Sequence, residues 1–216
     1  MAHPELPEIV SRAEWRAARE ELLAKEEAVT RARDALGAER RGLPMVEVGK
    51  EYVFEGGDGK ARLLDLFDGR RQLVVHHFMF APEWRSGCRC CAAFLDQVGQ
   101  LAHLNACGTS FAVVSRAPFT RILPFKARMG WTVPWYSSYD DDFNGDFEAT
   151  VGQPGGFAER PGVSCFLREG DRVFHTYSVF DRELDRLGPA MSLLDLTALG
   201  PPPSGAPVRY HDEYEF

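Results

Sequence analysis

An apolar run that leads into two cysteines constrains the fold of this chain more than any other feature. Leu73-Val-Val-His-His-Phe-Met-Phe80 has the length and composition of a buried β-strand. A short loop with Pro82 and Gly87 follows, and Cys88-Arg-Cys-Cys91 then opens a helix-compatible segment, residues 92–98. A C-x-x-C pair between a buried strand and a helix is typical of thiol–disulfide chemistry.

The spacing predicts a different role for each thiol of this pair. A helix N-terminus presents unpaired N–H groups and a partial positive charge to Cys88. Such an environment lowers a cysteine pKa from about 8.5 towards neutral pH. Arg85 and Arg89 are expected to favour the thiolate further and to bind the substrate. We therefore expect Cys88 to attack a substrate disulfide and Cys91, one turn later, to resolve the mixed disulfide. Trp84, beside Cys88 in the loop, is expected to form one wall of a substrate groove.

Composition limits the class of protein. The chain has 216 residues, of which 44% are hydrophobic and 26% charged, and this length suits one large domain with an added terminal arm. Its net charge of -7 gives no support for nucleic-acid binding. The start of the chain lacks the features of a signal peptide, and no apolar stretch approaches the ~20 residues of a membrane span. We expect a cytoplasmic protein that binds neither nucleic acid nor membrane.

The number of cysteines favours thiol chemistry over a disulfide framework. Five is an odd count, and structural disulfides are rare in the cytoplasm. Cys90 is expected to pack as a small residue on another helix face. Cys107 and Cys165 stand alone in apolar surroundings, and we expect both to be buried structural thiols.

The N-terminal segment is expected to form a long helix, from about Pro7 to Arg41. Ser11-Arg-Ala-Glu14 matches a capping box. An apolar stripe repeats every seven residues, a spacing suited to packing against another helix; its members are Trp15, Leu22, Val29 and Leu36. Such an arm packs either on its own domain or on a partner, and we expect a docked helix that helps to form a homodimer.

The remaining sequence alternates strand and helix signals. A hairpin is expected around Gly56–Gly59 and a second one over 163–177. Between the two hairpins, parallel strands joined by right-handed crossovers are expected. The expected strands are 73–80, 110–115 and 131–136, and the expected helices are 88–104 and 118–129. Residues 140–162 are expected to be irregular, and a helix over 181–196 closes the domain. This organisation gives an arm over 1–42, a domain over 43–200 and a surface tail over 201–216.

This order of elements resembles the thioredoxin superfamily, near its peroxiredoxin and thiol-reductase branch. Almost the whole chain further resembles an uncharacterised bacterial thioredoxin-like family, domain of unknown function 899. The resemblance implies an α/β fold: a thioredoxin-like three-layer sandwich with a mixed central sheet, here with a long N-terminal helical arm. The matching landmarks are 24–33, His77–Phe80, Gly87-Cys88, Cys91, Val114–Pro118, Arg128–Trp131, Pro134-Trp135, Phe143-Asn144, Phe174–Ser178 and His211–Tyr214.

The resemblance also implies a substrate-binding proline opposite the cysteine pair. In the superfamily this proline is cis, and Pro161 is the candidate, with Gly162 in the thioredoxin register. The chain departs from the superfamily at Trp84, which lies four residues before Cys88 rather than beside it. The peroxiredoxin pattern of a Pro and Thr leading into one lone cysteine is absent, so peroxidase activity is not the expected one.

Two functions follow from these residues. The first is a thiol–disulfide oxidoreductase that acts on protein or small-molecule disulfides without a cofactor. The alternative is a non-catalytic binding protein of the same fold, in which Cys88, Cys91, His77 and His175 hold Cu or Zn. We expect no metal, because there is no second C-x-x-C and no closely spaced pair of histidine ligands.

Overall fold

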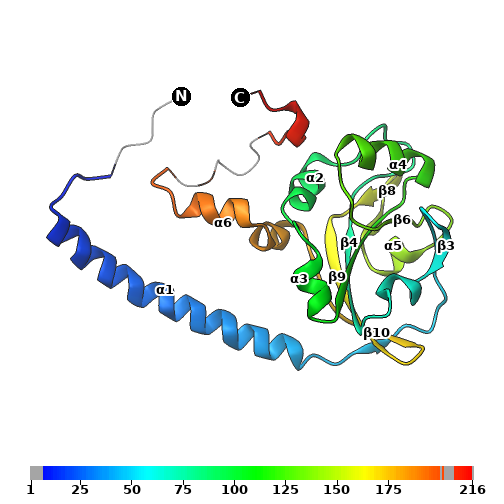
Figure 1. Cartoon of the computed structure of the whole chain (residues 1–216), viewed down its shortest axis with the longest axis horizontal. Coiled ribbons are helices and arrows are strands. Elements are labelled where there is room, and N and C mark those ends of the chain that lie inside the picture. Colours follow the sequence, from blue (N-terminus) through cyan, green and yellow to red (C-terminus); the bar gives the residue numbers. More distant parts are fainter. Residues whose placement is uncertain (1–6, 200, 202–206, 216) are drawn as a thin grey trace.

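A computed structural model describes residues 7–199, 201 and 207–215, apart from the side chains at 185 and 186. Its centre is an eight-stranded sheet with the strand order β1-β10-β9-β4-β5-β6-β2-β3, and a separate hairpin, β7-β8, lies outside it. Figure 1 shows this sheet wrapped by helices, with one long helix extending away from the body.

The middle of the sheet is parallel. β4 (Gln72–His77) pairs with β5 (Thr109–Ser115), which pairs in turn with β6 (Trp135–Ser137), and both pairs are parallel. Val75, His76 and Val113 are fully buried, because both faces of these strands are covered. The predicted alternation of parallel strands and helices is therefore confirmed.

The flanks of the sheet are antiparallel, so the sheet is mixed as expected. On the β4 side these strands are β9 (Gly162–Glu169), β10 (Arg172–Phe180) and β1 (Val46–Glu47). On the β6 side they are β2 (Val53–Gly56) and β3 (Gly59–Arg62). The predicted hairpin at Gly56–Gly59 joins these last two strands, and Gly59 takes a φ of +102° there, which favours glycine.

Helices form the two outer layers. On one face, α2 (Arg89–Asp96) and α4 (Phe119–Arg128) pack in one apolar cluster with β4 and β5. On the other, η1 (Asp65–Phe67) and α5 (Phe143–Asp146) pack in a second cluster. The three-layer expectation is thus confirmed. The remaining helices in the described ranges are α1 (Arg12–Arg41), α3 (Ala102–Ala106), η2 (Asp181–Leu187), α6 (Pro189–Asp195) and η3 (His211–Glu213).

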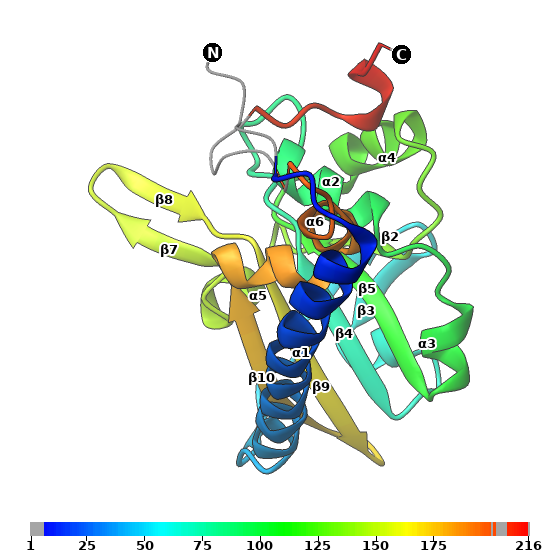
Figure 2. The same cartoon turned by 90° about the vertical axis from the view of Figure 1, so that its left-hand side faces the viewer.

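Three expected elements differ from the structure. The helix over 181–196 is instead η2 and α6, separated at Gly188, which has an extended backbone. The single helix over 88–104 is instead α2 and α3, separated at Gly99, which takes a φ of +66° that a helix interior does not allow. The region 140–162 is ordered rather than irregular. It holds α5 and the hairpin of β7 (Thr150–Gln153) with β8 (Gly156–Glu159), which projects from the body in Figure 2.

The N-terminal helix begins as predicted but does not dock. Ser11 and Glu14 form the capping box. None of the 30 residues of α1 is buried, and Figure 1 shows the helix running away from the sheet. Its last turn contacts the domain through Arg40, which lies 4.8 Å over the Tyr177 ring, but the apolar stripe does not pack on the domain and stays exposed. None of the helices in the described ranges is both long and apolar enough to cross a membrane.

Candidate functional site

The cysteine pair lies where the loop after β4 meets α2. Cys88 is the N-cap residue, with the extended backbone angles φ -66° and ψ 134°. Its backbone N–H donates to the Met79 carbonyl at 2.9 Å, and the Met79 N–H donates to Sγ of Cys91 at 3.5 Å. One residue just beyond the end of β4 therefore holds both cysteines, because the loop folds back onto the strand that precedes it.

The two thiols of the pair differ in charge state. The pKa of Cys88 is lowered to about 6, chiefly by a hydrogen bond from the Cys91 thiol and then by the backbone N–H groups of Cys91 and Cys90, against the opposing effect of burial. The same hydrogen bond to Cys88, together with burial, raises the pKa of Cys91 well above its ordinary value. None of the five cysteines forms a disulfide. At neutral pH the site therefore pairs a Cys88 thiolate with a protonated Cys91.

Gly87 allows this close approach of loop and helix. A Cβ at this position would lie 2.4 Å from the buried ring of Phe78 and 2.9 Å from that of Phe125. Both rings belong to the cluster beneath α2, so they have little room to move. Gly87 thus lets the chain pass over the core directly before Cys88.

The C-terminal tail packs against this loop, a contact that the sequence did not reveal. Tyr210 is 5% exposed and its hydroxyl donates to the Gly87 carbonyl. Arg89 lies over the Tyr210 ring, 5.2 Å from its centroid, and pairs with Glu213 at 3.1 Å. Arg128 lies over the same ring at 5.0 Å. The expected surface tail is therefore part of the site over residues 207–215, whereas 202–206 and 216 lie outside the described residues.

The predicted role of the two arginines at Cys88 is corrected. Arg89 faces the C-terminal tail, Arg85 is exposed, and neither is among the groups that lower the pKa of Cys88. The pKa of Cys88 is lowered by the Cys91 thiol and by backbone N–H groups at the start of the helix. The effect of the helix was predicted, and that of the Cys91 thiol was not. Trp84 is half-buried against the apolar cluster beneath α2, and its carbonyl accepts a hydrogen bond from Arg121 at 3.0 Å.

Pro161 and Gly162 lie beside the end of β4. Gly162 opposes His77 in the β4–β9 pairing. A Cβ at this position would lie 2.5 Å from the Phe180 ring, so glycine leaves room for that ring. The peptide bond before Pro161 is trans, like every other peptide bond in the described ranges. The cis isomer implied by the resemblance is therefore not present, and the substrate-binding role of both residues stays a prediction.

The alternative metal ligands are divided between the two faces of the sheet. His76 faces α2, with its ring 4.7 Å from that of Phe94, whereas His77 stacks on Phe143 in the opposite layer at 5.5 Å. Burial lowers the pKa of His76 to about 4 and that of His77 to about 3. The set of Cys88, Cys91, His77 and His175 is thus not assembled, and no three metal-ligating side chains gather within the described residues.

The other cysteines differ from expectation in their burial. Cys107 is exposed rather than buried, Cys165 is half-buried, and Cys90 is exposed on α2. Burial raises the pKa of Cys165. The pKa is thus lowered at Cys88 and raised at Cys91 and Cys165.

Solved structures similar to this chain include peroxiredoxin Q of Xanthomonas campestris. A cysteine-to-serine mutant of that protein is 16% identical, with a TM-score of 0.50 over 65% of this chain and 90% of the other. The bacterioferritin comigratory protein of the same organism, in trapped intermediate and ligand complexes, is 15% identical with the same score and coverage. At this identity the likeness concerns the fold, and it confirms the expected thioredoxin-like architecture.

Comparison of the sequence itself leads to a family. No curated protein matches the chain. The family described as bacterial protein of unknown function (DUF899) matches residues 4–214. That range includes α1, the cysteine pair and the C-terminal tail, so the chain belongs to this family over almost its whole length.

Proposed function

We propose that the protein is a thiol–disulfide oxidoreductase that uses Cys88 and Cys91. The observation that carries this proposal is the lowered pKa of Cys88, about 6, at the first turn of α2 and in hydrogen-bond contact with a protonated Cys91. A thiolate is the form that attacks disulfides. The protonated partner supplies the second thiol that the reaction needs.

The proposed reaction proceeds in two displacements. The Cys88 thiolate attacks one sulfur of a substrate disulfide, the S–S bond breaks, and the first substrate thiolate leaves. Cys91 then gives up its proton and attacks the Cys88 sulfur of the mixed disulfide, which releases the second substrate thiolate. The substrate gains two electrons, the protein gains a Cys88–Cys91 disulfide, and an external dithiol must reduce that disulfide before the next cycle.

We propose that the substrate binds over the loop and the start of β9. Trp84 and Arg85 come from the loop, and Gly162 pairs with His77 at the end of β4, next to Pro161 in the chain. The reaction uses protein or small-molecule disulfides and requires no metal or organic cofactor. We also propose a cytoplasmic location, because the cytoplasm keeps thiols such as Cys88 and Cys91 reduced.

Alkylation kinetics test the proposal directly. With iodoacetamide and mass mapping, Cys88 should react first, and its rate should rise as pH increases through about 6 and level off above it, because the thiolate then predominates. Cys165 should react only slowly at neutral pH, since burial raises its pKa. Rates for Cys88 as slow as those for Cys165 would contradict the proposal and favour the non-catalytic binding protein.

A matched variant checks the cause of this reactivity. Cys91→Ala removes the hydrogen bond that contributes most to the low pKa of Cys88. The midpoint of the alkylation profile should therefore move to higher pH, whereas Cys107→Ala, which changes an exposed thiol, should leave it unchanged. An unmoved midpoint in Cys91→Ala would show that the first turn of the helix alone sets the pKa.

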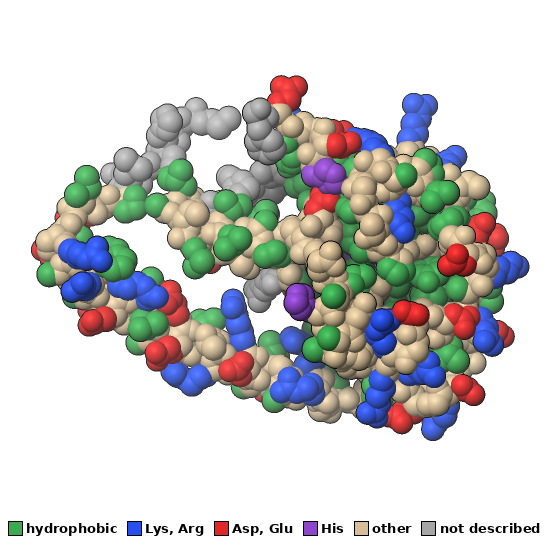
Figure 3. All heavy atoms as spheres, viewed as in Figure 1, with side chains coloured by type: hydrophobic (Ala, Val, Ile, Leu, Met, Phe, Trp, Pro, Cys, Tyr) green, Lys and Arg blue, Asp and Glu red, His purple; other side chains and the backbone are tan. Residues whose placement is uncertain are grey.

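We also propose that α1 mediates a homodimer. The seven-residue stripe remains exposed, and Figure 3 shows apolar side chains along the arm among its charges. A heptad spacing is the pattern by which two helices pack, and a second copy supplies an identical helix. The exposed fractions are 55% for Trp15, 49% for Leu22, 51% for Val29 and 53% for Leu36.

Light scattering should distinguish a dimer from a monomer. The full chain is expected to be a dimer, and a chain that begins at Gly42 is expected to be a folded monomer, because α1 contributes no buried residue to the domain. Leu22→Glu should dissociate the dimer by placing a carboxylate in the stripe. Ala24→Glu, on the opposite helix face, should not. A monomeric full chain would contradict the dimer.

A further inference from the structure

A second site lies on the face of the sheet opposite the cysteine pair. A cavity of about 380 Å³ opens where β1, β10 and the segment after α5 meet. Phe147 and Tyr52 belong to the apolar layer that contains Phe143, not to the layer beneath α2. The cavity is therefore separated from Cys88 by the sheet, and the proposed redox chemistry does not use it.

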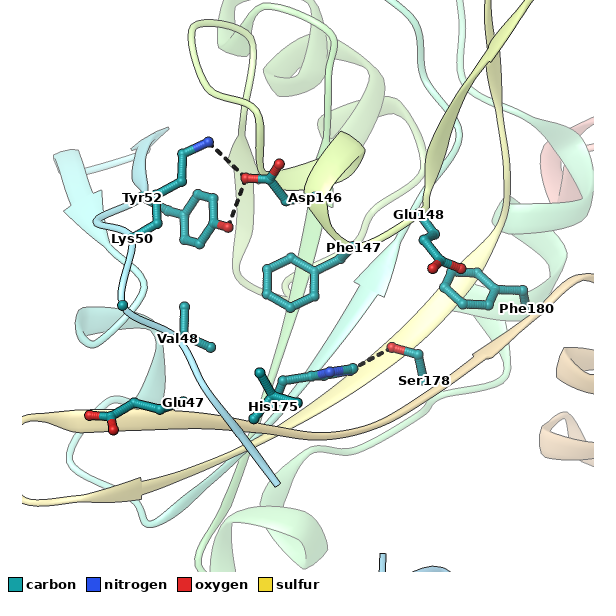
Figure 4. Close-up of a pocket in the computed structure, with 12 residues that line it drawn as sticks. Glu47, Val48, Lys50, Tyr52, Asp146, Phe147, Glu148, His175, Ser178 and Phe180 are labelled. Carbon is teal, nitrogen blue, oxygen red and sulfur yellow. Dashed lines mark hydrogen bonds and ion pairs between the residues drawn. The ribbon is translucent and has the colours of Figure 1, made fainter. Parts of the chain in front are cut away.

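Aromatic rings supply much of the cavity wall. Figure 4 shows Phe147 between Tyr52 on one side and Phe180 on the other, with His175 below. The rings of Phe147 and His175 lie 5.3 Å apart at 70°, in an edge-to-face arrangement. Ring faces and edges of this kind suit a ligand with a flat apolar body.

The cavity already surrounds one ammonium group with carboxylates and a ring. Nζ of Lys50 lies 2.9 Å from Asp142 and 2.7 Å from Asp146, and 5.3 Å from the centroid of the Tyr52 ring. The Tyr52 hydroxyl donates to the same Asp146 carboxylate at 2.9 Å. The positive charge of Lys50 is thus fully compensated and does not favour an anionic ligand.

Glu148 contributes an exposed carboxylate to the cavity lining. Its carboxylate forms no hydrogen bond or ion pair in the described part of the chain, whereas Glu47, also at the cavity, is paired with Arg172. The backbone of Glu148 has a φ of +57°, a left-handed conformation that non-glycine residues seldom adopt. Both Glu148 and Phe180 line the cavity, and Figure 4 shows them on its side away from Tyr52.

A chain of hydrogen bonds fixes the remaining polar wall. His175 Nε2 lies 2.8 Å from Ser178 Oγ, which lies 2.7 Å from Ser164 Oγ, which lies 2.8 Å from Nε2 of the buried His77. Partial burial lowers the pKa of His175, against the opposing effects of the Tyr177 backbone and the Glu148 charge, and so favours the neutral ring. The histidine therefore adds a ring to the cavity without adding a positive charge that would repel a cation.

We propose that this cavity binds a small organic ammonium compound with a flat apolar body. The ammonium group pairs with the Glu148 carboxylate, and the apolar body packs against Phe147 and His175. The Phe180 ring is not part of the cation site, because the Arg160 guanidinium, paired with Asp181, already lies 4.3 Å from its centroid. Attraction between a cation and aromatic faces adds to the ion pair when both are partly removed from water. The site is independent of the thiol chemistry on the other face of the sheet.

Three probes of similar size and different charge test the proposal by calorimetric titration of the full chain. Phenethylamine, which is protonated at neutral pH, should bind about fivefold more tightly than neutral phenethyl alcohol, the scale of one partly exposed ion pair. Phenylacetate, an anion, should bind most weakly. Absence of binding by phenethylamine, or equal affinity for the amine and the alcohol, would overturn the proposal.

Variants at Glu148 identify the cavity as the binding site. Glu148→Gln should remove the preference for the amine, and Glu148→Lys should reverse it in favour of phenylacetate. Glu55→Gln changes an exposed carboxylate on β2, outside the cavity, and should leave all three affinities unchanged. An amine preference that survives Glu148→Gln would overturn the proposal. Cys88→Ser should bind the amine like the unaltered chain, which separates this site from the proposed redox function.

Discussion

Replacing Cys88 with serine should lower the turnover of hydroxyethyl disulfide by at least roughly a thousandfold, the scale seen when a nucleophile is removed. Serine is similar in size but cannot form a thiolate, so the first displacement is lost. Turnover would be measured with a dithiol as the electron donor. The same substitution at the exposed Cys107 is the matched control and should leave turnover unchanged.

Cys91→Ser should fail at a different step. The Cys88 sulfur can still attack, but the resolving thiol is missing, so a mixed disulfide between Cys88 and the substrate should accumulate and be visible by mass spectrometry. Full turnover in either variant would contradict the assigned roles. A hydroperoxide offered in place of the disulfide is the control for substrate class, and faster turnover of the peroxide would reassign that class.

Phe143→Ala should destabilise the protein by about 3–5 kcal/mol, the usual cost of removing a fully buried phenylalanine ring. The ring is 0% exposed. It packs at 5.0 Å from Phe54 and 4.7 Å from Phe147, and it stacks on His77 at 5.5 Å. Its removal leaves a cavity between the sheet and α5 that these rings can only partly fill. Urea unfolding measured by far-UV circular dichroism would give the change.

The matched control for this variant is Phe157→Ala. Phe157 is 68% exposed on β8, and its truncation should change the free energy of unfolding by no more than about 0.5 kcal/mol. A loss below about 1 kcal/mol in Phe143→Ala would mean that the layer around α5 is not a tightly packed core.

The strand, the loop and the start of α2 could be predicted because their signals are local. The apolar run of β4 and the capping box at Ser11 each lie within a few neighbouring residues. The start of α2 at Cys88 follows from residues on either side of it, and with it the expectation of a lowered pKa. For the same reason the hairpin at Gly56–Gly59 was correctly predicted, since a glycine-rich turn fixes its own backbone.

The role of Arg89 could not be predicted, because its partners lie far away in sequence. Proximity to Cys88 suggested that its charge favours the thiolate, yet the guanidinium packs on Tyr210 and pairs with Glu213, 124 residues away. No local pattern marks Tyr210 as the residue that holds the Gly87 carbonyl. The prediction that Cys107 is buried was wrong for a related reason, since apolar neighbours in sequence do not establish neighbours in space.

The sequence by itself determined the parallel strands β4, β5 and β6 with α4 between them, the capped N-terminal helix and the position of Cys88 at the start of α2. Only the tertiary structure decided on which face of the sheet His77 lies, that the C-terminal tail holds the loop before Cys88, and that Glu148 and His175 border one cavity. The division has a physical origin. Periodicity and capping act over a few residues, whereas strand pairing and packing join residues that no local pattern connects.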